Sequence, residues 1–414
     1  MTESKRLRSE ELEPASAGPG PLEGVRVLDV STMMAAPWAA TYMADYGADV
    51  VKVELPGRGD PVRDWGTQHA GSSLAWKGLS RNKRLVTLAL NKPAGQELVL
   101  RLIPDFDVLV ENFRPGVMER WGLAPERLHE ANPRLIILRT TGYGQTGPWA
   151  SKPGFGTLAE AFAGLSNITG AEDRPPVLAG YPLADGVAAL SGVMGILAAL
   201  YWRDAKGGTG QVIDNAIIEA NYRLIDYTML DFEKFGIIRE RSGNRLSDLA
   251  PRNTYRTRDG HWIAISGGTQ GIVQGLFEAM GRPELMSDER FRDNASRLEN
   301  VEQLDDIIGD WIASKGVDEV TSIFEENQVA GAPVNDTEQI ANHPHFRERN
   351  VFQRVNDPEL GVTSTTHVHP RLSRTPGGVM HLGGRIGQDN ESFYLEEAGL
   401  TALEFEQLRV DGVI

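Results

Sequence analysis

The chain has 414 residues, and domains of about 150 residues would divide it into two or three. It carries 42 basic and 57 acidic residues, a net charge of −15, so it lacks the basic character of a general nucleic-acid binder. The absence of cysteine excludes disulfides, thiolate nucleophiles, thiolate-bound zinc and iron–sulfur clusters. The composition, 41% hydrophobic and 24% charged, is that of a globular protein with a sizeable core.

The amino-terminal stretch 1–20 is polar and has no hydrophobic core, which predicts a disordered tail and not a secretory signal. No apolar run is expected to reach the roughly 18–20 residues that cross a bilayer. We therefore expect a cytoplasmic protein with neither a membrane nor a nucleic acid as a partner.

From residue 21 onward, apolar runs rich in β-branched residues alternate with helical patterns. The alternation predicts helices at 36–46 and 93–103 and strands at 25–30, 49–55, 85–90, 107–111 and 135–140. Strands separated by helices favour a parallel sheet that is covered on both faces. The sequence therefore predicts a doubly wound, mostly parallel, Rossmann-like α/β domain over 21–215.

The second half of the chain has a different pattern. A long apolar helix is predicted at 186–204, ended by the glycines of 207–210, and 216–245 is assigned to a linker helix. A smaller α/β domain is predicted at 246–335, with a hairpin over 255–266 around Asp259-Gly260. The remainder is rich in loops and ends in a helix at 402–408.

Common nucleotide and hydrolase motifs are absent from the sequence. The first strand ends in Asp29-Val-Ser-Thr-Met-Met, without the glycine pattern of a dinucleotide site, and neither a phosphate-binding P-loop nor a G-x-S-x-G elbow occurs. Two histidine pairs, His343 with His345 and His367 with His369, have a spacing that some metal sites use on a strand. No third ligand is recognisably placed beside either pair, so no metal is expected and solvated polar segments are the favoured interpretation.

Asp185 directly precedes the long apolar helix and admits two interpretations. A structural aspartate there would cap the helix by accepting hydrogen bonds from its first amides. A functional aspartate would use the same position, where the helix dipole keeps the carboxylate ionised, to attack an activated acyl group.

Several ordered motifs resemble one known family. Taken in their order along the chain, these motifs resemble those of the class III CoA-transferases of the CaiB/BaiF type, which include formyl-CoA:oxalate and carnitine CoA-transferases. The motifs are Leu22-Glu-Gly-Val-Arg-Val-Leu-Asp, Asp45-Tyr-Gly-Ala-Asp-Val-Val-Lys-Val-Glu, Val110-Glu-Asn-Phe-Arg-Pro-Gly, Thr141-Gly-Tyr-Gly-Gln-Thr-Gly-Pro and Ala184-Asp-Gly.

The resemblance implies roles for individual residues. Asp185 matches the catalytic aspartate of the family, and Arg63, Trp65 and Phe155 are assigned to the acyl pocket. Arg63 is the candidate that would bind the distal carboxylate of a dicarboxylic acid through two parallel hydrogen bonds, although pairing with a neighbouring aspartate is the alternative. The residues matched to CoA contacts are Met33, Met34, Ala35, Leu88, Asn112, Phe113, Arg120 and Lys152.

Some positions depart from relatives. Met34 stands where some relatives carry a glutamine, Ala75 replaces an aromatic residue of the oxalate enzyme, and no counterpart of that enzyme's glycine-rich loop is found around 246–270. The related α-methylacyl-CoA racemases need a histidine just after Gly154, where this chain has Phe155. A racemase activity therefore remains an alternative, although this chain lacks the histidine that acts as the base in the racemases.

The resemblance implies transfer of CoA from an acyl-CoA to a free carboxylic acid, with a small dicarboxylate as the expected acceptor. Asp185 would pass through an anhydride and an aspartyl-CoA thioester, with CoA and acyl-CoA as substrates and no permanently bound cofactor or metal. The family fold implies an interlocked homodimer, in which 336–360 returns the chain and 361–414 rejoins the large domain. A protein that binds acyl-CoA without turnover is the non-enzymatic alternative.

Overall fold

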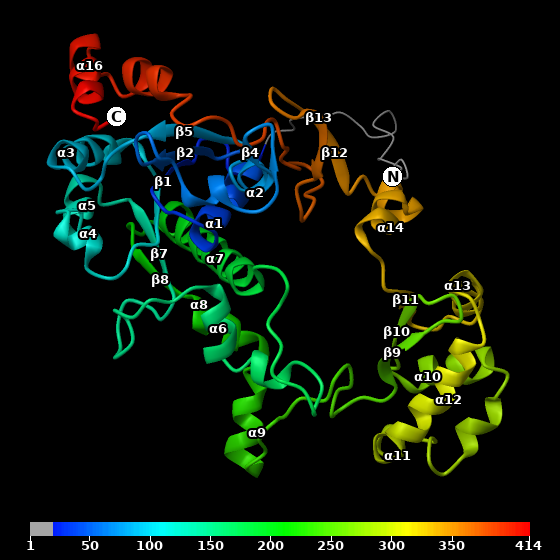
Figure 1. Ribbon diagram of the computed structural model, residues 1–414. Helices are drawn as coiled ribbons and strands as arrows, with labels where there is room; N and C mark the ends of the chain where they lie inside the picture. Colours follow the sequence, from blue (N-terminus) through cyan, green and yellow to red (C-terminus); the bar gives the residue numbers. More distant parts are fainter. Residues whose placement is uncertain (1–19) are drawn as a thin grey trace. The chain divides into compact units, whose positions relative to one another are not determined.

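The computed structural model describes residues 20–414, so the predicted tail falls, except for its last residue, outside the described part of the chain. The chain forms two compact units (Figure 1). The first unit contains residues 20–165, 178–230 and 344–414, and the second contains 166–177 and 231–343. Both units are discontinuous in sequence, and the boundaries differ from the predicted ones at 215, 246 and 335.

A six-stranded parallel sheet forms the centre of the first unit, with the strand order β5-β2-β1-β6-β7-β8. All five predicted strands are confirmed to within two or three residues at each end, and the sequence missed only the edge strand β8. The strands are β1 Arg26–Asp29, β2 Asp49–Glu54, β5 Lys83–Thr87, β6 Val108–Glu111, β7 Ile136–Thr141 and β8 Val212–Ala216. The chain leaves β1 first toward β2 and later toward β6, so the strand order reverses between β1 and β6, where doubly wound sheets bind ligands.

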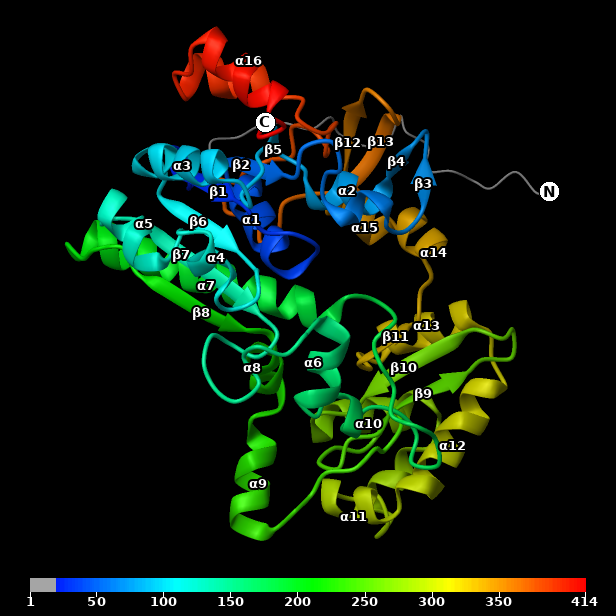
Figure 2. The same ribbon diagram turned by 60° about the vertical axis from the view of Figure 1, so that its left-hand side comes forward.

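Helices cover both faces of this sheet (Figure 2). On one face, α1 Ala35–Asp45 packs against α7 Leu183–Ala205, and the small side chains of Ala36, Ala39 and Ala40 let the two helices approach closely. On the other face, α3 Pro93–Leu102, α5 Pro125–Ala131 and α16 Ala402–Val410 contribute to a second apolar core. The remaining helices of this unit are α2 Leu74–Leu79, α4 Val117–Arg120, α6 Gly156–Phe162, α8 Ile217–Tyr222 and α15 Pro344–Glu348. Helix α9 Tyr227–Phe235 crosses into the second unit, which also contains α14 Thr337–Asn342.

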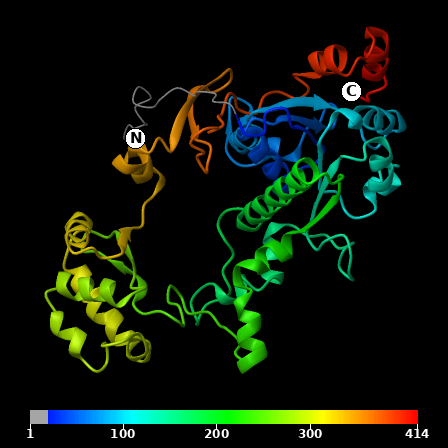
Figure 3. The same ribbon diagram turned by 180° about the vertical axis from the view of Figure 1, so that it is seen from behind.

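Helix α7 is the long green helix beside the sheet (Figures 1 and 3). It begins at Leu183, three residues before the predicted start. Contrary to the sequence-based expectation, its length and apolar composition would allow it to cross a membrane, with 39% of its most apolar window buried. The same length and composition also occur in core helices, and one face of α7 is buried against α1 and the sheet.

Four charged side chains are buried together at one end of the sheet. Lys83 Nζ lies 2.9 Å from Asp29, and Lys52 Nζ lies 3.2 Å from Asp60 and 3.8 Å from Asp29. Lys52 also donates a hydrogen bond to the carbonyl of Ser31. Burial alone would raise the pKa of Asp29, but the two lysines outweigh it and hold that pKa below its usual value.

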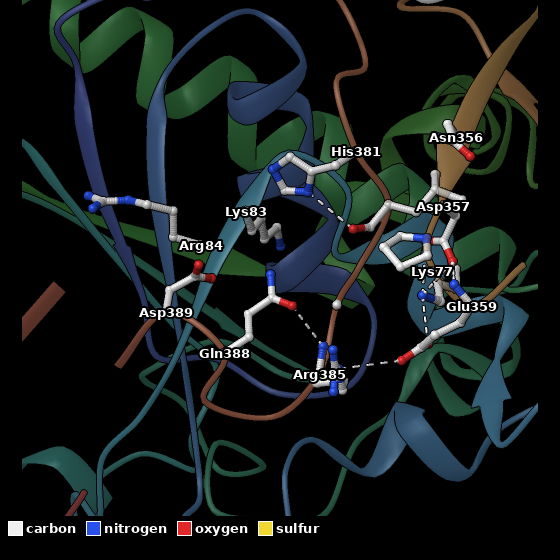
Figure 4. Close-up of a pocket in the computed structure, with 13 residues that line it drawn as sticks. Lys77, Lys83, Arg84, Asn356, Asp357, Glu359, His381, Arg385, Gln388 and Asp389 are labelled. Carbon is white, nitrogen blue, oxygen red and sulfur yellow. Dashed lines mark hydrogen bonds and ion pairs between the residues drawn. The ribbon is translucent and has the colours of Figure 1, made fainter. Parts of the chain in front are cut away.

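The carboxy-terminal segment packs against the first unit through buried polar contacts (Figure 4). Lys77 on α2 lies 2.9 Å from Asp357, which ends β12 Phe352–Asp357, and 2.8 Å from Glu359, which lies in the turn before β13 Gly361–Thr366. Tyr394 donates a hydrogen bond of 2.9 Å to the carbonyl of Thr87 at the end of β5. The last seventy residues are therefore part of the same compact unit as the first strands.

The second unit has its own small sheet and core. The predicted hairpin is confirmed as β9 Arg252–Arg256 paired antiparallel with β10 Trp262–Ser266, and β11 Gly331–Pro333 adds a third strand. Its helices are α10 Gln270–Ala279, α11 Asn294–Glu299, α12 Val301–Ala313 and α13 Val317–Glu326. Residues 166–177 join this unit because the amide of Gly243 donates to the carbonyl of Gly170 over 2.8 Å, a pairing of distant segments that no local pattern indicates.

We expect Lys83→Met to lower the free energy of unfolding by about 3–5 kcal/mol, because it leaves the buried carboxylate of Asp29 with a weaker set of partners. Urea unfolding followed by circular dichroism measures the change. Arg134→Met is the control, since Arg134 forms an exposed ion pair with Asp204 and should cost less than about 1 kcal/mol. Equal effects of the two substitutions would contradict a stabilising role for the buried charges.

Candidate active site

A pocket of about 490 Å³ lies in the first unit, where β1, β6 and β7 end. Its position matches the switch point of the sheet, because the loops that follow β1 and β6 both line it. Eight predicted site residues line this pocket, namely Met33, Met34, Ala35, Trp65, Asn112, Lys152, Phe155 and Asp185.

The loop after β1 is held in place from two sides. Asn112 bridges the switch point, since its side chain accepts from the amide of Thr32 over 2.8 Å and donates to the carbonyl of Thr32 over 2.7 Å. Asp60 accepts from the amide of Met33 over 3.3 Å. Met33 has a φ of 67°, a left-handed conformation that costs energy for a residue with a side chain, so these contacts hold a strained turn at the pocket.

Asp185 lies in the first turn of α7, and the N-cap position belongs to Pro182. The predicted capping role is therefore wrong, because the helix begins three residues earlier than the apolar pattern suggests. Among the described residues, no hydrogen bond or ion pair holds the Asp185 carboxylate. The backbone of α6 comes so close to it that a Cβ at Gly156 would lie 2.4 Å from Oδ2, which only glycine avoids.

The pKa of Asp185 is raised to about 6, first by burial and second by the negative charge of Glu160. The start of the helix favours the charged form of this carboxylate, but desolvation and the neighbouring negative charge outweigh that effect on the pKa. At pH 7 the group is still ionised in roughly nine molecules of ten. The pocket thus presents an ionised carboxylate that is more basic than an ordinary aspartate.

Two cationic side chains line the same pocket, Arg114 and Lys152. Lys152 Nζ lies 3.3 Å from the centre of the Trp149 ring, a cation–π contact that orients the amine. Arg114 was not among the predicted site residues, although it stands inside the Asn112-Phe-Arg-Pro-Gly motif. Carboxylate and cations together suit a substrate that carries an electrophilic carbonyl and negative groups.

Three residues matched to CoA contacts lie outside the pocket lining. Leu88 is only 2% exposed and belongs to the apolar core. Phe113 packs edge-on against Trp121 with ring centres 4.9 Å apart, and Arg120 ends the short helix α4. The resemblance alone therefore supports a CoA contact for these three.

Arg63 does not line the pocket. Its guanidinium is bound by Glu54 through two hydrogen bonds of 2.6 and 2.7 Å, donates 3.0 Å to the carbonyl of Gly384, and lies 3.8 Å from the centre of the Trp76 ring. Its planar fork is thus already occupied by a carboxylate of this chain. The proposed contact with a substrate carboxylate is incompatible with this arrangement, and the partner is Glu54, not a neighbouring aspartate.

Neither histidine pair sits on a strand as a metal site would require. His343 follows α14, His345 lies in α15, and His367 and His369 follow the end of β13. Within residues 20–414, no group of three or more histidine, aspartate or glutamate side chains is arranged to hold a metal ion.

Comparison with known proteins defines the class. Residues 22–390 match CoA-transferase family III, and the chain belongs to this family. It is 42% identical to succinyl-CoA–D-citramalate CoA-transferase of Chloroflexus aurantiacus, covering 96% of this chain and 98% of that protein. It is 35% identical to succinyl-CoA:mesaconate CoA-transferase of Haloarcula hispanica, covering 92% and 97%.

A solved structure supports the same assignment. A CaiB/BaiF family protein from Brucella suis has a TM-score of 0.80 and 29% identity, covering 92% of this chain and all of that one. The family resemblance and the α/β fold are therefore confirmed, and the protein is a class III CoA-transferase. Such enzymes use CoA thioesters as substrates and need no permanently bound cofactor.

We expect Asp185→Asn to raise the free energy of unfolding at pH 8 by about 1–2 kcal/mol, because it removes a carboxylate that folding makes harder to ionise. A carboxyl group whose pKa is raised by folding destabilises the folded state when the pH is above its folded pKa, near 6. It has no effect when the pH is below its pKa in the unfolded chain, near 4. The gain should therefore disappear in urea unfolding at pH 4. A loss of stability at pH 8 would show that the carboxylate is held by favourable contacts.

Proposed function

We propose that this enzyme moves CoA from an acyl-CoA donor to a small dicarboxylic acid, with Asp185 as the nucleophile. The observation that carries the proposal is the ionised, unpartnered carboxylate of Asp185 in a pocket with Arg114 and Lys152. Citramalate and mesaconate, named in two relatives, are both dicarboxylates, and both relatives are named for succinyl-CoA. We expect the reaction to take place in the cytoplasm.

The first half-reaction begins with attack by the Asp185 carboxylate on the thioester carbonyl of the donor. The carbon–sulfur bond breaks, CoA leaves as the thiolate, and an acyl-aspartyl anhydride remains. The thiolate then attacks the aspartyl carbonyl and breaks its bond to the donor oxygen. The products are an aspartyl-CoA thioester and the free donor acid.

In the second half-reaction, the acceptor carboxylate attacks the aspartyl thioester and again releases the thiolate. The thiolate attacks the acceptor carbonyl of the new anhydride, which forms the acceptor thioester and restores the Asp185 carboxylate. One thioester replaces another, so no external energy source is needed. The task of the pocket is to exclude water and to stabilise the negative oxygens that develop.

The CoA contacts are proposed on the loops at the switch point. Met33, Met34 and Ala35 surround the uncapped start of α1, and Asn112 fixes this loop. Lys152 and Arg114 supply positive charge for a polyanionic substrate in a chain that is otherwise acidic. Phe155, 63% exposed, and Trp65, 46% exposed, provide apolar surface at the acyl group.

Incubation with succinyl-CoA and no acceptor should leave a covalent adduct on Asp185, since the aspartyl thioester is an intermediate of the proposed route. Hydroxylamine should convert the adduct to a hydroxamate in the peptide that contains Asp185, detected by mass spectrometry. Asp185→Asn should give no adduct and no transfer, while Asp173→Asn, an exposed aspartate, should behave like the unaltered enzyme. Full transfer without any adduct in repeated trials would overturn the covalent route.

A homodimer, interlocked as the resemblance implies, is also proposed. Its support is an apolar stripe on α7, where Leu190, Met194 and Tyr201 are 55%, 66% and 60% exposed at helical spacing. A contiguous apolar face of this kind on a soluble protein marks a contact surface.

We expect light scattering to give the mass of a dimer for the unaltered protein and a lower mass for Met194→Asp, which places a charge in the middle of the stripe. Arg409→Asp, exposed in the last turn of α16, is the control and should leave the mass unchanged. A monomer mass for the unaltered protein would refute the dimer.

A further inference from the structure

Helix α6 presents two residues of one face to the start of α7. Gly156 and Glu160 are four residues apart on α6, which places them on the same side of the helix. At Gly156 this side lies directly against Asp185, because a Cβ there would be 2.4 Å from its carboxylate. Glu160 follows one turn later and is only 5% exposed.

Glu160 is tied to the segment that leads into α7. Its carboxylate accepts a hydrogen bond of 3.0 Å from the amide of Ala179, six residues before Asp185. No cation among residues 20–414 forms an ion pair with it. A buried carboxylate that has a backbone donor but no counter-ion is costly for folding, which calls for a reason other than stability.

Other charged groups on the surrounding elements are engaged elsewhere or lie on the solvent side. Asp45 at the end of α1 is bound by Arg81, and Arg139 on β7 is bound by Glu111. On β8, Asp214 accepts from the amide of Gln145. On α8, Glu219 is exposed and Tyr222 is the last residue of the helix. The cations Arg114 and Lys152 line the pocket.

We propose that Glu160 is a positioning residue of the transferase, which anchors the entry to α7 and, through its own negative charge, favours acylation of Asp185. The proposal rests on the proposed nucleophile. While Asp185 is a free carboxylate, it lies against α6 at Gly156, one turn from the buried carboxylate of Glu160, in a partly desolvated site. In the anhydride and in the CoA thioester, the carboxylate of Asp185 has become a neutral acyl group, so the repulsion is relieved. The free enzyme is thereby raised in energy relative to both covalent intermediates.

Glu160→Gln is the informative variant, because its amide oxygen still accepts from Ala179 while the charge is gone. We expect the Asp185 carboxylate to titrate at lower pH in this variant, and the amount of aspartyl-CoA formed at equilibrium with succinyl-CoA to fall about tenfold for each pH unit of that displacement. Glu160→Ala should also lose the hydrogen bond from the amide of Ala179, so we expect its kcat to be lower than that of Glu160→Gln. Glu219→Gln, which removes an equal charge from α8, should change neither the titration nor the adduct.

The titration is measured without turnover. Isotope-edited infrared spectra of protein labelled with carbon-13 at the aspartate carboxyl, taken as the difference from Asp185→Asn, report the ionisation of this one group. An unchanged titration in Glu160→Gln would overturn the proposal, as would an unchanged adduct yield in a folded Glu160→Gln protein. Absence of any adduct in the unaltered enzyme, with a displaced titration in Glu160→Gln, would instead refute the nucleophile and confirm only the placement of Glu160. Glu160→Asp, which keeps the charge, should retain the titration near pH 6 and serves if Glu160→Gln folds poorly.

Discussion

The buried ion cluster of Asp29, Lys52, Asp60 and Lys83 is the interaction on which the pocket depends. Each of these side chains is at most 1% exposed, so every charge must be balanced by another charge of the cluster. Asp29 ends β1, Lys52 lies on β2 and Lys83 begins β5. The cluster therefore joins three neighbouring strands by electrostatics, next to the loop that follows β1.

The cluster acts on the active-site loop through Asp60. One oxygen of Asp60 faces Lys52, and the other accepts from the amides of Val62 and Met33. Lys52 also donates to the carbonyl of Ser31, so both ends of the short turn before α1 are attached to the same buried charges. The left-handed backbone of Met33 persists because these contacts over-determine it.

Much of the fold could be predicted from local patterns. Strands such as Asp49–Glu54 are short, valine-rich runs that are buried on both faces, and the dense run of alanines in Ala35–Asp45 indicates a helix that packs closely. The edge strand Val212–Ala216 was missed because only one side of it is paired and three of its five side chains are exposed or partly exposed. The start of α7 was placed too late because Leu183 and Ala184 follow a proline and give no periodic signal of their own.

The site was predictable only where its residues lie in contiguous motifs. Asn112, Lys152 and Asp185 stand beside strand or helix ends, and their position in the chain already indicates the crevice. The partner of Arg63 was not predictable, since Glu54 and Gly384 are 9 and 321 residues away and both act on one guanidinium. Glu160 carries no signal either, because its importance comes from the missing side chain at Gly156 and from a backbone amide in another segment.

Paired and unpaired charges thus have different roles within one unit. Where a buried charge must only support the fold, as in Lys77 with Asp357 or Arg63 with Glu54, a carboxylate and a cation meet at hydrogen-bond distance. Among residues 20–414, Asp185 and Glu160 have no such cation, and in the proposed mechanism the cost of leaving two carboxylates near each other in a partly dry site falls on the free enzyme. A nucleophile whose charge is already stabilised by an arginine would lose that contact on acylation. In the mechanism proposed here, a nucleophile beside another carboxylate gains from acylation instead, because its charge is absent from both the anhydride and the thioester.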